Sequence, residues 1–405
     1  MRRPDPGRLR AAVACVAFLA AWSLLHAPLY SHAVISDTRV YAGFGDQMRI
    51  GAVPYRDFAV EYPPAALPVF VAPTFISGYR ATFEYPAGEL PRFVSSPDLG
   101  SYSTTFGWLM AACGLATLLG VAASRPSRLG LAFVAVSPLL IGSLALSRYD
   151  FWPAALAAAA LAALLRDRHR IGWALLGAAI ATKLYPCAVV PLAVVWTWRR
   201  AGGRELRRAA AVGAGVIAAI FLPFFVLAPH GLWTSLWGQF ARPLQIESLA
   251  GSWLMLSRTP NVIGSHGSLS LSGAGAWSTA TSVVGLASLT ALWIAFAARP
   301  VDRERLLRYT AASICVFVAF DKVLSPQYLI WLVPVVPLVA GLRGRLATIV
   351  LAAIFGLTFA YFPARYYDFV HHDHGLAAVV FARDLALVGL ALLLSLPAPG
   401  RARSS

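Results

Sequence analysis

Long apolar segments recur from one end of this chain to the other, and short polar stretches separate them. A helix needs about 20 mostly apolar residues to cross the hydrocarbon core of a bilayer. The pattern therefore predicts an all-α polytopic integral membrane protein with about twelve spanning helices. The whole chain, 1–405, forms a single integral membrane domain in this interpretation. The predicted helices are 11–29, 101–123, 129–147, 151–165, 171–182, 184–198, 209–228, 277–298, 309–320, 325–341, 346–362 and 376–396.

One apolar segment, 63–78, does not fit the pattern of spanning helices. It contains Pro63, Pro64, Pro68 and Pro73, and proline disrupts a helix interior. If this segment crossed the bilayer, every later basic cluster would change sides. We therefore predict a short re-entrant or interfacial segment on the outer side of the membrane. Irregular backbone at that depth needs protein or water around it, so the segment predicts an outward-facing cavity.

The distribution of charge predicts the orientation of the chain. It has 34 Lys and Arg against 18 Asp and Glu, a formal net charge of +16. The basic residues form short clusters between apolar segments rather than one basic face, which argues against nucleic acid as a partner. Basic loops stay in the cytoplasm, which predicts that both termini are cytoplasmic. The clusters are Arg2 to Arg10, Arg125 and Arg128, Arg166 to Arg170, Arg199 to Arg208, Arg299 to Arg308, Arg343 and Arg345, and Arg401 and Arg403.

The overall composition excludes two broad classes. Hydrophobic residues make up 58% of the chain and charged residues 13%, whereas a soluble domain has about 25% charged residues. A disordered chain would be polar and poor in aromatic residues. The apolar run 11–29 follows Arg2 and Arg3 like a signal peptide, but it is long and lacks a convincing cleavage site, so we interpret it as a retained helix. The four cysteines have no paired spacing that would indicate a disulfide or metal site.

Two long connections, 30–100 and 229–276, are both expected on the outer side, while the inner loops are short. Chemistry on a membrane scaffold usually lies in the long loops. We therefore expect the functional site on the extracytoplasmic face of the plasma membrane. Ionisable residues near membrane depth are functional candidates by default.

Asp37 lies shortly after the first predicted helix, 11–29, and has two interpretations. Asp37 or Ser36 could cap a short surface helix over 38–50. Alternatively, the Asp37 carboxylate could act as a general base, since it lies where it could reach a substrate in the outer leaflet. The turn Arg148-Tyr149-Asp150 also has two interpretations. Its arginine and aspartate could form a local ion pair, or the turn could form part of the cavity wall, with Arg148 facing an anion.

Only two of the 34 basic residues are lysines, Lys183 and Lys322, and both lie at outer helix ends. Such lysines are often snorkelling anchors, but a compact ammonium is also suited to binding phosphate. Glu247 in the second long connection is either a solvated loop residue or part of a site. The run 371–374, with three histidines, predicts a hydrated loop rather than a metal site.

The order of these motifs along the chain is more informative than any one of them. Taken together, the set resembles the family 87 glycosyltransferases, GT-C-fold α-mannosyltransferase-like membrane proteins of actinobacteria. The resemblance runs from about Asp37 to Tyr328. After Asp37 it comprises Gly51-x-x-Pro54-Tyr55-x-Asp57, Glu61-Tyr62-Pro63-Pro64, Arg148-Tyr149-Asp150, Lys183-Leu184-Tyr185-Pro186 and Lys322-x-x-Ser325-Pro326-Gln327-Tyr328.

This resemblance implies a GT-C-like, inverting hexosyltransferase. Such an enzyme moves mannose from a polyprenyl-phosphate donor to a lipid-linked or cell-envelope glycan acceptor, and it needs neither a cofactor nor a metal ion. Asp37 would be the catalytic base. From their positions and charge, Lys322, Lys183 and Arg148 are the candidates to bind the donor phosphate. The sugar-binding positions would be Asp57, Glu61, Tyr62, Asp150, Glu247 and Gln327.

Two other classes of function remain open from the sequence. Twelve helices with both termini inside are also typical of a transporter or lipid flippase. The chain lacks a visible six-plus-six repeat and has long outer connections, which argues against that class. A non-catalytic subunit of a cell-envelope complex is the third interpretation.

Overall fold

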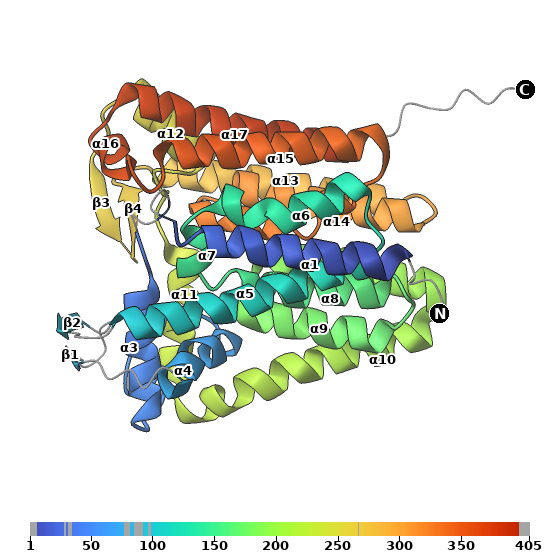
Figure 1. Cartoon of the computed structure of the whole chain (residues 1–405), viewed down its shortest axis with the longest axis horizontal. Helices are drawn as coiled ribbons and strands as arrows, with labels where there is room; N and C mark the ends of the chain where they lie inside the picture. Colours follow the sequence, from blue (N-terminus) through green and yellow to red (C-terminus); the bar gives the residue numbers. More distant parts are fainter. Residues whose placement is uncertain are drawn as a thin grey trace, which may run out of the picture.

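The computed structural model describes residues 6–27, 30, 35–76, 82–84, 92–95, 99–265 and 267–396. Long helices lie side by side along the longest axis of the molecule (Figure 1). At the end away from the N-terminus, short helices and two hairpins gather over the bundle (Figure 1). The long elements are α1 (Pro6–Leu24), α5 (Leu99–Ala123), α6 (Arg128–Ile141), α8 (Phe151–Leu164), α9 (His169–Thr182), α10 (Val190–Leu227), α13 (Gly275–Ala297), α14 (Arg303–Phe320), α15 (Gly341–Tyr361) and α17 (His374–Ser395).

Short elements connect these helices. The helices are α3 (Thr38–Arg49), α4 (Leu67–Ile76), α7 (Leu144–Ser147), α11 (Pro229–Ala241), α12 (Leu249–Ser257) and α16 (Tyr366–Val370). Four 3₁₀ turns are η1 (Pro64–Ala66), η2 (Tyr185–Val189), η3 (Pro326–Leu332) and η4 (Val336–Leu338). Strand β1 (Thr82–Glu84) pairs antiparallel with β2 (Arg92–Ser95), and β3 (Val262–Ser265) pairs antiparallel with β4 (Ser268–Leu271).

The structure confirms a polytopic helical membrane protein. Among the described residues, six helical segments are long and apolar enough to cross a membrane: α1, α5, Tyr185–Leu227, α13, α15 and α17. Four shorter apolar segments accompany them, at Pro64–Ile76, Arg128–Ile141, Phe151–Leu164 and Pro326–Leu338. The number of twelve crossings and the cytoplasmic position of both termini stay predictions.

Four predicted helices differ from the observed elements. The segment 325–341 is wrong as an α-helix, since it forms the 3₁₀ turns η3 and η4. Proline lacks the N–H that a regular helix requires, and this segment contains three prolines. The predicted helix 129–147 ends early at Ile141, where Gly142 adopts a positive φ of 66°. The predicted helices 184–198 and 209–228 are the two parts of α10, which meet at Gly202 with φ 77°.

The proline-rich segment forms η1 and the short helix α4, which packs against α3. The ring of Tyr41 stacks on that of Phe70, with centroids 4.4 Å apart. A Cβ on Gly45 would lie 2.4 Å from the Phe70 carbonyl oxygen, so glycine permits the close approach of the two helices. The Tyr102 hydroxyl donates to that same carbonyl at 2.9 Å. This packing orients α3, the helix that begins beside Asp37.

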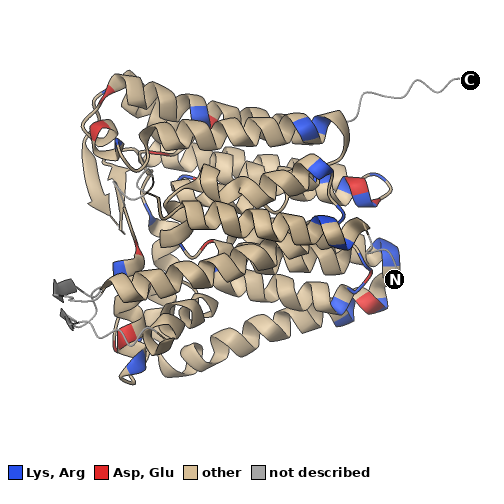
Figure 2. Ribbon diagram, in the orientation of Figure 1, with Lys and Arg blue, Asp and Glu red and all other residues tan. Residues whose placement is uncertain are grey.

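Basic residues gather at the end of the bundle that carries the N-terminus (Figure 2). They lie in the turns between α5 and α6, between α8 and α9, and between α13 and α14. The opposite end carries both acidic and basic residues (Figure 2). The positive-inside rule would place the N-terminal end in the cytoplasm and the opposite end outside.

Candidate active site

A cavity of about 1180 Å³ is lined in part by residues of α11 and of the β3–β4 hairpin. These elements lie at the end of the molecule away from the N-terminus (Figure 1). Ligand pockets of about 300–1,000 Å³ are typical for small molecules, so this cavity has room for a sugar and part of a second molecule. Both predicted long outer connections contribute to its wall. Its charged lining residues are Asp37, Glu61, Arg148, Lys183, Arg242, Glu247, Asp321 and Lys322.

Asp37 stands at the N-terminus of α3, but its side chain does not cap the helix. Instead, the Ser36 hydroxyl accepts a hydrogen bond from the Thr38 N–H at 3.1 Å. The Asp37 carboxylate forms an ion pair with Arg148 and accepts a hydrogen bond from the Tyr41 hydroxyl at 3.4 Å. Its side chain is 29% exposed and borders the cavity. The capping interpretation is therefore wrong for Asp37, and its carboxylate is available to a ligand.

Arg148 does not form the local ion pair with Asp150 that the turn suggested. Its guanidinium pairs with Asp37 and donates to the Ile35 carbonyl oxygen at 3.2 Å. The residue is buried. Because two contacts hold the guanidinium, Arg148 fixes the position of the Asp37 carboxylate at the cavity wall.

Lys183 is turned inward rather than toward the membrane surface, so the snorkelling interpretation is wrong for this residue. Its Nζ lies 2.6 Å from Asp150 Oδ1, and Asp150 is 1% exposed. The Trp331 indole N–H donates to the same oxygen at 2.7 Å. The ammonium also faces the rings of Tyr149, Tyr328 and Trp331 at 4.7–5.2 Å, which are favourable cation–π distances. Burial lowers the pKa of Lys183, and the Asp150 carboxylate opposes that shift.

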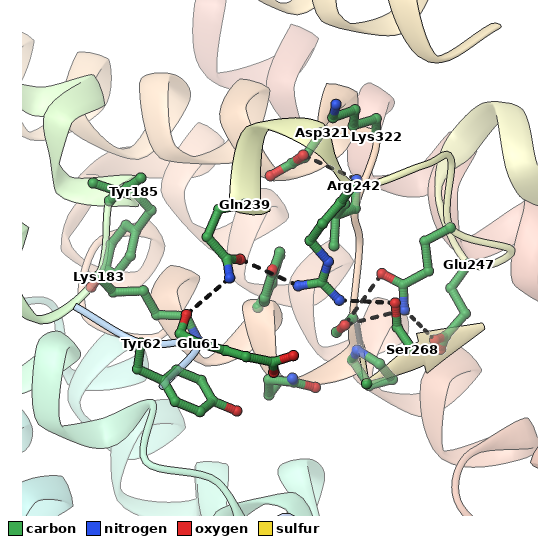
Figure 3. A pocket seen from close by; sticks show the side chains of 18 of the residues that line it. Glu61, Tyr62, Lys183, Tyr185, Gln239, Arg242, Glu247, Ser268, Asp321 and Lys322 are labelled. Carbon is green, nitrogen blue, oxygen red and sulfur yellow. Dashed lines mark hydrogen bonds between the residues drawn. The ribbon is translucent and has the colours of Figure 1, made fainter. Parts of the chain in front are cut away.

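Arg242 is a cavity residue that the sequence interpretation did not select. It directly follows α11, and its guanidinium donates to Gln239 Oε1 at 3.4 Å and to Ser268 Oγ at 2.8 Å (Figure 3). Nearby, Lys322 Nζ donates to the Phe240 carbonyl oxygen at 2.6 Å. The sequence offers one signal for Arg242, which is an arginine within the predicted outer connection 229–276.

The predicted sugar-binding residues separate into two groups. Glu61, Tyr62 and Gln327 line the cavity, and the Gln239 amide donates to the Glu61 carbonyl oxygen at 2.9 Å. Asp57 lies elsewhere, where its carboxylate pairs with Arg56 at 2.9 Å and accepts the Val53 N–H at 2.7 Å. The Arg56 guanidinium lowers the pKa of Asp57 to about 2.

Asp150 is not part of the cavity lining, since it lies behind Lys183. The structure thus places Asp37, Arg148, Lys183 and Lys322 around one cavity and sets Asp57 apart. The catalytic and binding roles of all these residues stay predictions.

Glu247 also lines the cavity, but it is 2% exposed, so the interpretation as a solvated loop residue is wrong. Its carboxylate accepts hydrogen bonds from the Tyr361 hydroxyl at 2.7 Å and the Gln245 amide at 3.0 Å. Arg383 donates to its backbone carbonyl oxygen at 2.8 Å. Burial raises the pKa of Glu247 to about 7, although Arg383 and both hydrogen bonds oppose the shift.

This pKa predicts a pH-dependent stability. A carboxyl with a raised folded-state pKa keeps a proton that the unfolded chain releases, so stability falls as pH rises from about 4.5 to about 7. We expect Glu247→Gln to remove this component, which is about 3 kcal/mol at most. Thermal unfolding in detergent from pH 5 to pH 8 measures it. Glu304→Gln, at an exposed acid, is the matched control and should keep the wild-type slope. Equal slopes in wild type and Glu247→Gln would contradict the assignment.

The histidine-rich run 371–374 has a structural element at its centre. The Asp373 carboxylate accepts the Leu376 N–H at 2.9 Å and caps α17. Within the described part of the chain, no group of three or more His, Cys, Asp and Glu residues is placed to hold a metal ion.

Fold and cavity together define a polytopic helical membrane protein with a charged site at one end of its bundle. No protein-family model matches the chain, and no curated protein matches it significantly. Two solved structures of ArnT from Cupriavidus metallidurans are similar, one bound to undecaprenyl phosphate and one in the apo state. Each has 15% sequence identity and a TM-score of 0.45 over 95% of this chain, covering 76% and 75% of the respective ArnT chain. A likeness of this degree assigns neither family nor activity to this chain.

Proposed function

We propose that this protein is a membrane glycosyltransferase with a polyprenyl-phosphate sugar as donor. The observation that carries the proposal is the single cavity that joins the Asp37 carboxylate to Arg148, Lys183 and Lys322. A transfer of this kind needs a base for the acceptor and cations for the phosphate leaving group. The cavity contains both kinds of group, contributed by segments that are far apart in the sequence.

The proposed reaction is a direct displacement. Asp37 accepts the proton of an acceptor hydroxyl, and the hydroxyl oxygen attacks the anomeric carbon of the sugar. The bond between that carbon and the phosphate oxygen breaks, and polyprenyl phosphate leaves with the electron pair. Attack from the face opposite the leaving group inverts the anomeric configuration, as in inverting glycosidases.

The surrounding groups suit this chemistry. The Arg148 ion pair keeps the Asp37 carboxylate at the cavity wall, and an ionised carboxylate is the form that can accept a proton. Glu61, Gln327 and the buried Glu247 supply polar groups along the same wall, where they could hydrogen-bond sugar hydroxyls. We propose a hexose as the transferred sugar, with mannose first among the candidates because of the motif resemblance, and a lipid-linked or cell-envelope glycan as acceptor.

The proposed location follows from charge. The α11 and β3–β4 elements that line the cavity lie at the end of the bundle (Figure 1) opposite the basic clusters (Figure 2). Basic loops face the cytoplasm. We therefore place the active site on the extracytoplasmic face of the plasma membrane, where an outer-leaflet lipid can enter it.

The test is a transfer assay with the full chain in nanodiscs. Radiolabelled polyprenyl-phosphate mannose is supplied with a lipid extract from the native host, and matching donors with other sugars run in parallel. The expected result is a labelled product with one donor. Absence of product with every donor, together with substrate-dependent flux in proteoliposomes, would overturn the proposal in favour of a transporter.

A further inference from the structure

Three arginines converge on the C-terminal end of α5, at the end of the bundle where basic residues gather (Figure 2). Arg166, which follows α8, donates to the Ala123 carbonyl oxygen at 2.6 Å. Arg303, the first residue of α14, donates to the Ser124 carbonyl oxygen. Arg125 is the next residue of the chain and adopts a positive φ of 49°. These three arginines, from three separate segments, are called the α5 cluster below.

Close packing of α5 against α8 brings Arg166 to this position. A Cβ on Gly120 would lie 2.9 Å from the Ala158 Cβ, so glycine permits the two helices to approach each other. The Arg166 guanidinium also donates to the Ala162 carbonyl oxygen of α8 at 3.1 Å. Because two hydrogen bonds already orient this group, less conformational entropy is lost when a ligand binds to it.

Helix capping accounts for only part of the hydrogen-bonding capacity of these side chains. Arginines near a helix C-terminus commonly bond its last carbonyl oxygens. Within the described part of the chain, such bonds use two N–H groups of Arg166 and one of Arg303. A guanidinium has five N–H donors, and all three side chains of the α5 cluster are exposed. Donors therefore remain for a ligand.

The acidic residues nearest in sequence are engaged elsewhere. The Asp167 carboxylate pairs with Arg200 through two hydrogen bonds, at 2.7 and 3.0 Å. The Asp302 carboxylate accepts the Arg305 N–H at 2.8 Å and caps α14. Among the carboxylates that the structure describes, none forms an ion pair with a member of the α5 cluster. The cluster thus presents positive charge without a carboxylate partner in the described chain.

The charges of the α5 cluster act on one another. Burial lowers the pKa of Arg303, and the charges of Arg125 and Arg166 lower it further. The Glu304 carboxylate, next in the chain, acts electrostatically on Arg308. An anion bound among the guanidinium groups would relieve the repulsion between them.

Exposed apolar side chains flank the cluster in sequence. Leu119 on α5 is 52% exposed, and Leu129 on α6 is 43% exposed. The positive-inside rule would place this end of the bundle in the cytoplasm, where the leaflet carries anionic lipids. Basic groups between helices on that side bind the head groups of such lipids. Cationic side chains next to exposed leucines therefore suit an amphiphile with an anionic head.

We propose that the α5 cluster binds the phosphate diester of an anionic phospholipid, whose acyl chains lie along Leu119 and Leu129. A guanidinium matches two phosphate oxygens in a two-point contact. A lipid with net negative charge is favoured over a zwitterionic one, because the cluster has no carboxylate partner in the described chain to pair with an ammonium head group. None of the three arginines is among the described residues that line the cavity, and the proposal does not rest on the proposed function.

The test measures lipid binding to the full chain in detergent by native mass spectrometry. Phosphatidylglycerol, phosphatidylcholine with the same acyl chains, and inorganic phosphate are titrated separately and in competition. We expect the wild type to prefer phosphatidylglycerol. Arg125→Gln and Arg303→Gln should each weaken binding of this lipid about fivefold, the usual contribution of one basic residue at an anionic lipid surface.

Two control variants separate the site from general charge and from folding. Arg204→Gln, at an exposed arginine of the basic segment 199–208, should bind phosphatidylglycerol as the wild type does. Arg303→Lys keeps the charge and should retain most of the binding. Arg125→Gln removes no side-chain hydrogen bond within the described chain, so it tests the site even if thermal unfolding shows that Arg303→Gln is unstable.

Each outcome bears on the proposal. A loss of binding confined to the variants of the α5 cluster would support it. Equal wild-type affinity for phosphatidylglycerol and phosphatidylcholine, or unchanged phosphatidylglycerol binding in Arg125→Gln, would overturn it. An equal loss in Arg204→Gln would assign the binding to the basic end as a whole and overturn the site. Inorganic phosphate that displaces the lipid at equal concentration would overturn the lipid in favour of a soluble anion.

Discussion

Replacing Asp37 with asparagine is expected to slow sugar transfer by about two to four orders of magnitude, the usual contribution of a positioned general base. Asparagine has nearly the same shape but cannot accept the acceptor proton. The Asp37 carboxylate lies at the cavity wall and is held there by Arg148. A large loss of rate in a variant that still folds and inserts is therefore the signature of a base at this position.

The measurement is transfer from the donor identified in the nanodisc assay, with Asp368→Asn as the matched control. Asp368 is exposed and pairs with Arg365 at 3.4 Å outside the cavity lining, so this variant should transfer at the wild-type rate. Thermal unfolding of Asp37→Asn in detergent separates a loss of catalysis from a loss of folding. An Asp37→Asn enzyme with full activity would remove Asp37 as the base.

The second large effect is expected from Lys183→Met, which should destabilise the protein by about 3–5 kcal/mol. Asp150 is 1% exposed and Lys183 is the cation that contacts it. Removing one partner of a buried ion pair leaves an uncompensated buried charge, and that accounts for the cost. The Trp331 N–H remains on Asp150, but one neutral donor does not replace an ammonium.

Thermal unfolding in detergent measures this loss as a lower midpoint. The double variant Lys183→Met with Asp150→Asn should recover most of it, because the buried carboxylate is then neutral. Lys322→Met is the matched lysine control, and we expect a smaller loss because its Nζ contacts a backbone carbonyl at a less buried position. Similar losses in both single variants, without recovery in the double variant, would contradict the buried pair as the cause.

The double variant also separates two roles of Lys183. A stable double variant that transfers sugar at the wild-type rate would make Lys183 a structural residue. A stable double variant with strongly reduced transfer would support the predicted phosphate role. This distinction matters because the structure gives Lys183 a carboxylate partner within 2.6 Å.

The membrane class and most helices were predictable from the sequence because their cause is local. A long apolar run is more stable as a helix in lipid, where each backbone group must be hydrogen-bonded internally. The helix over 38–50 was also predictable and is observed as α3. The segment 325–341 was not, since its hydropathy resembles that of a spanning helix while its prolines direct it into 3₁₀ turns.

The partners of the charged residues were decided only by the tertiary structure. Sequence reasoning selected Asp37, Arg148, Lys183 and Lys322 one by one, because charges are rare beside apolar segments and costly unless paired. It could not show that Arg148 pairs with Asp37, nor that Trp331 reaches Asp150 across 181 residues. It also missed Arg242, whose position depends on α11 and β4 meeting at one cavity. Hydropathy and propensity act within a segment, whereas a charge finds its partner only after the helices have packed.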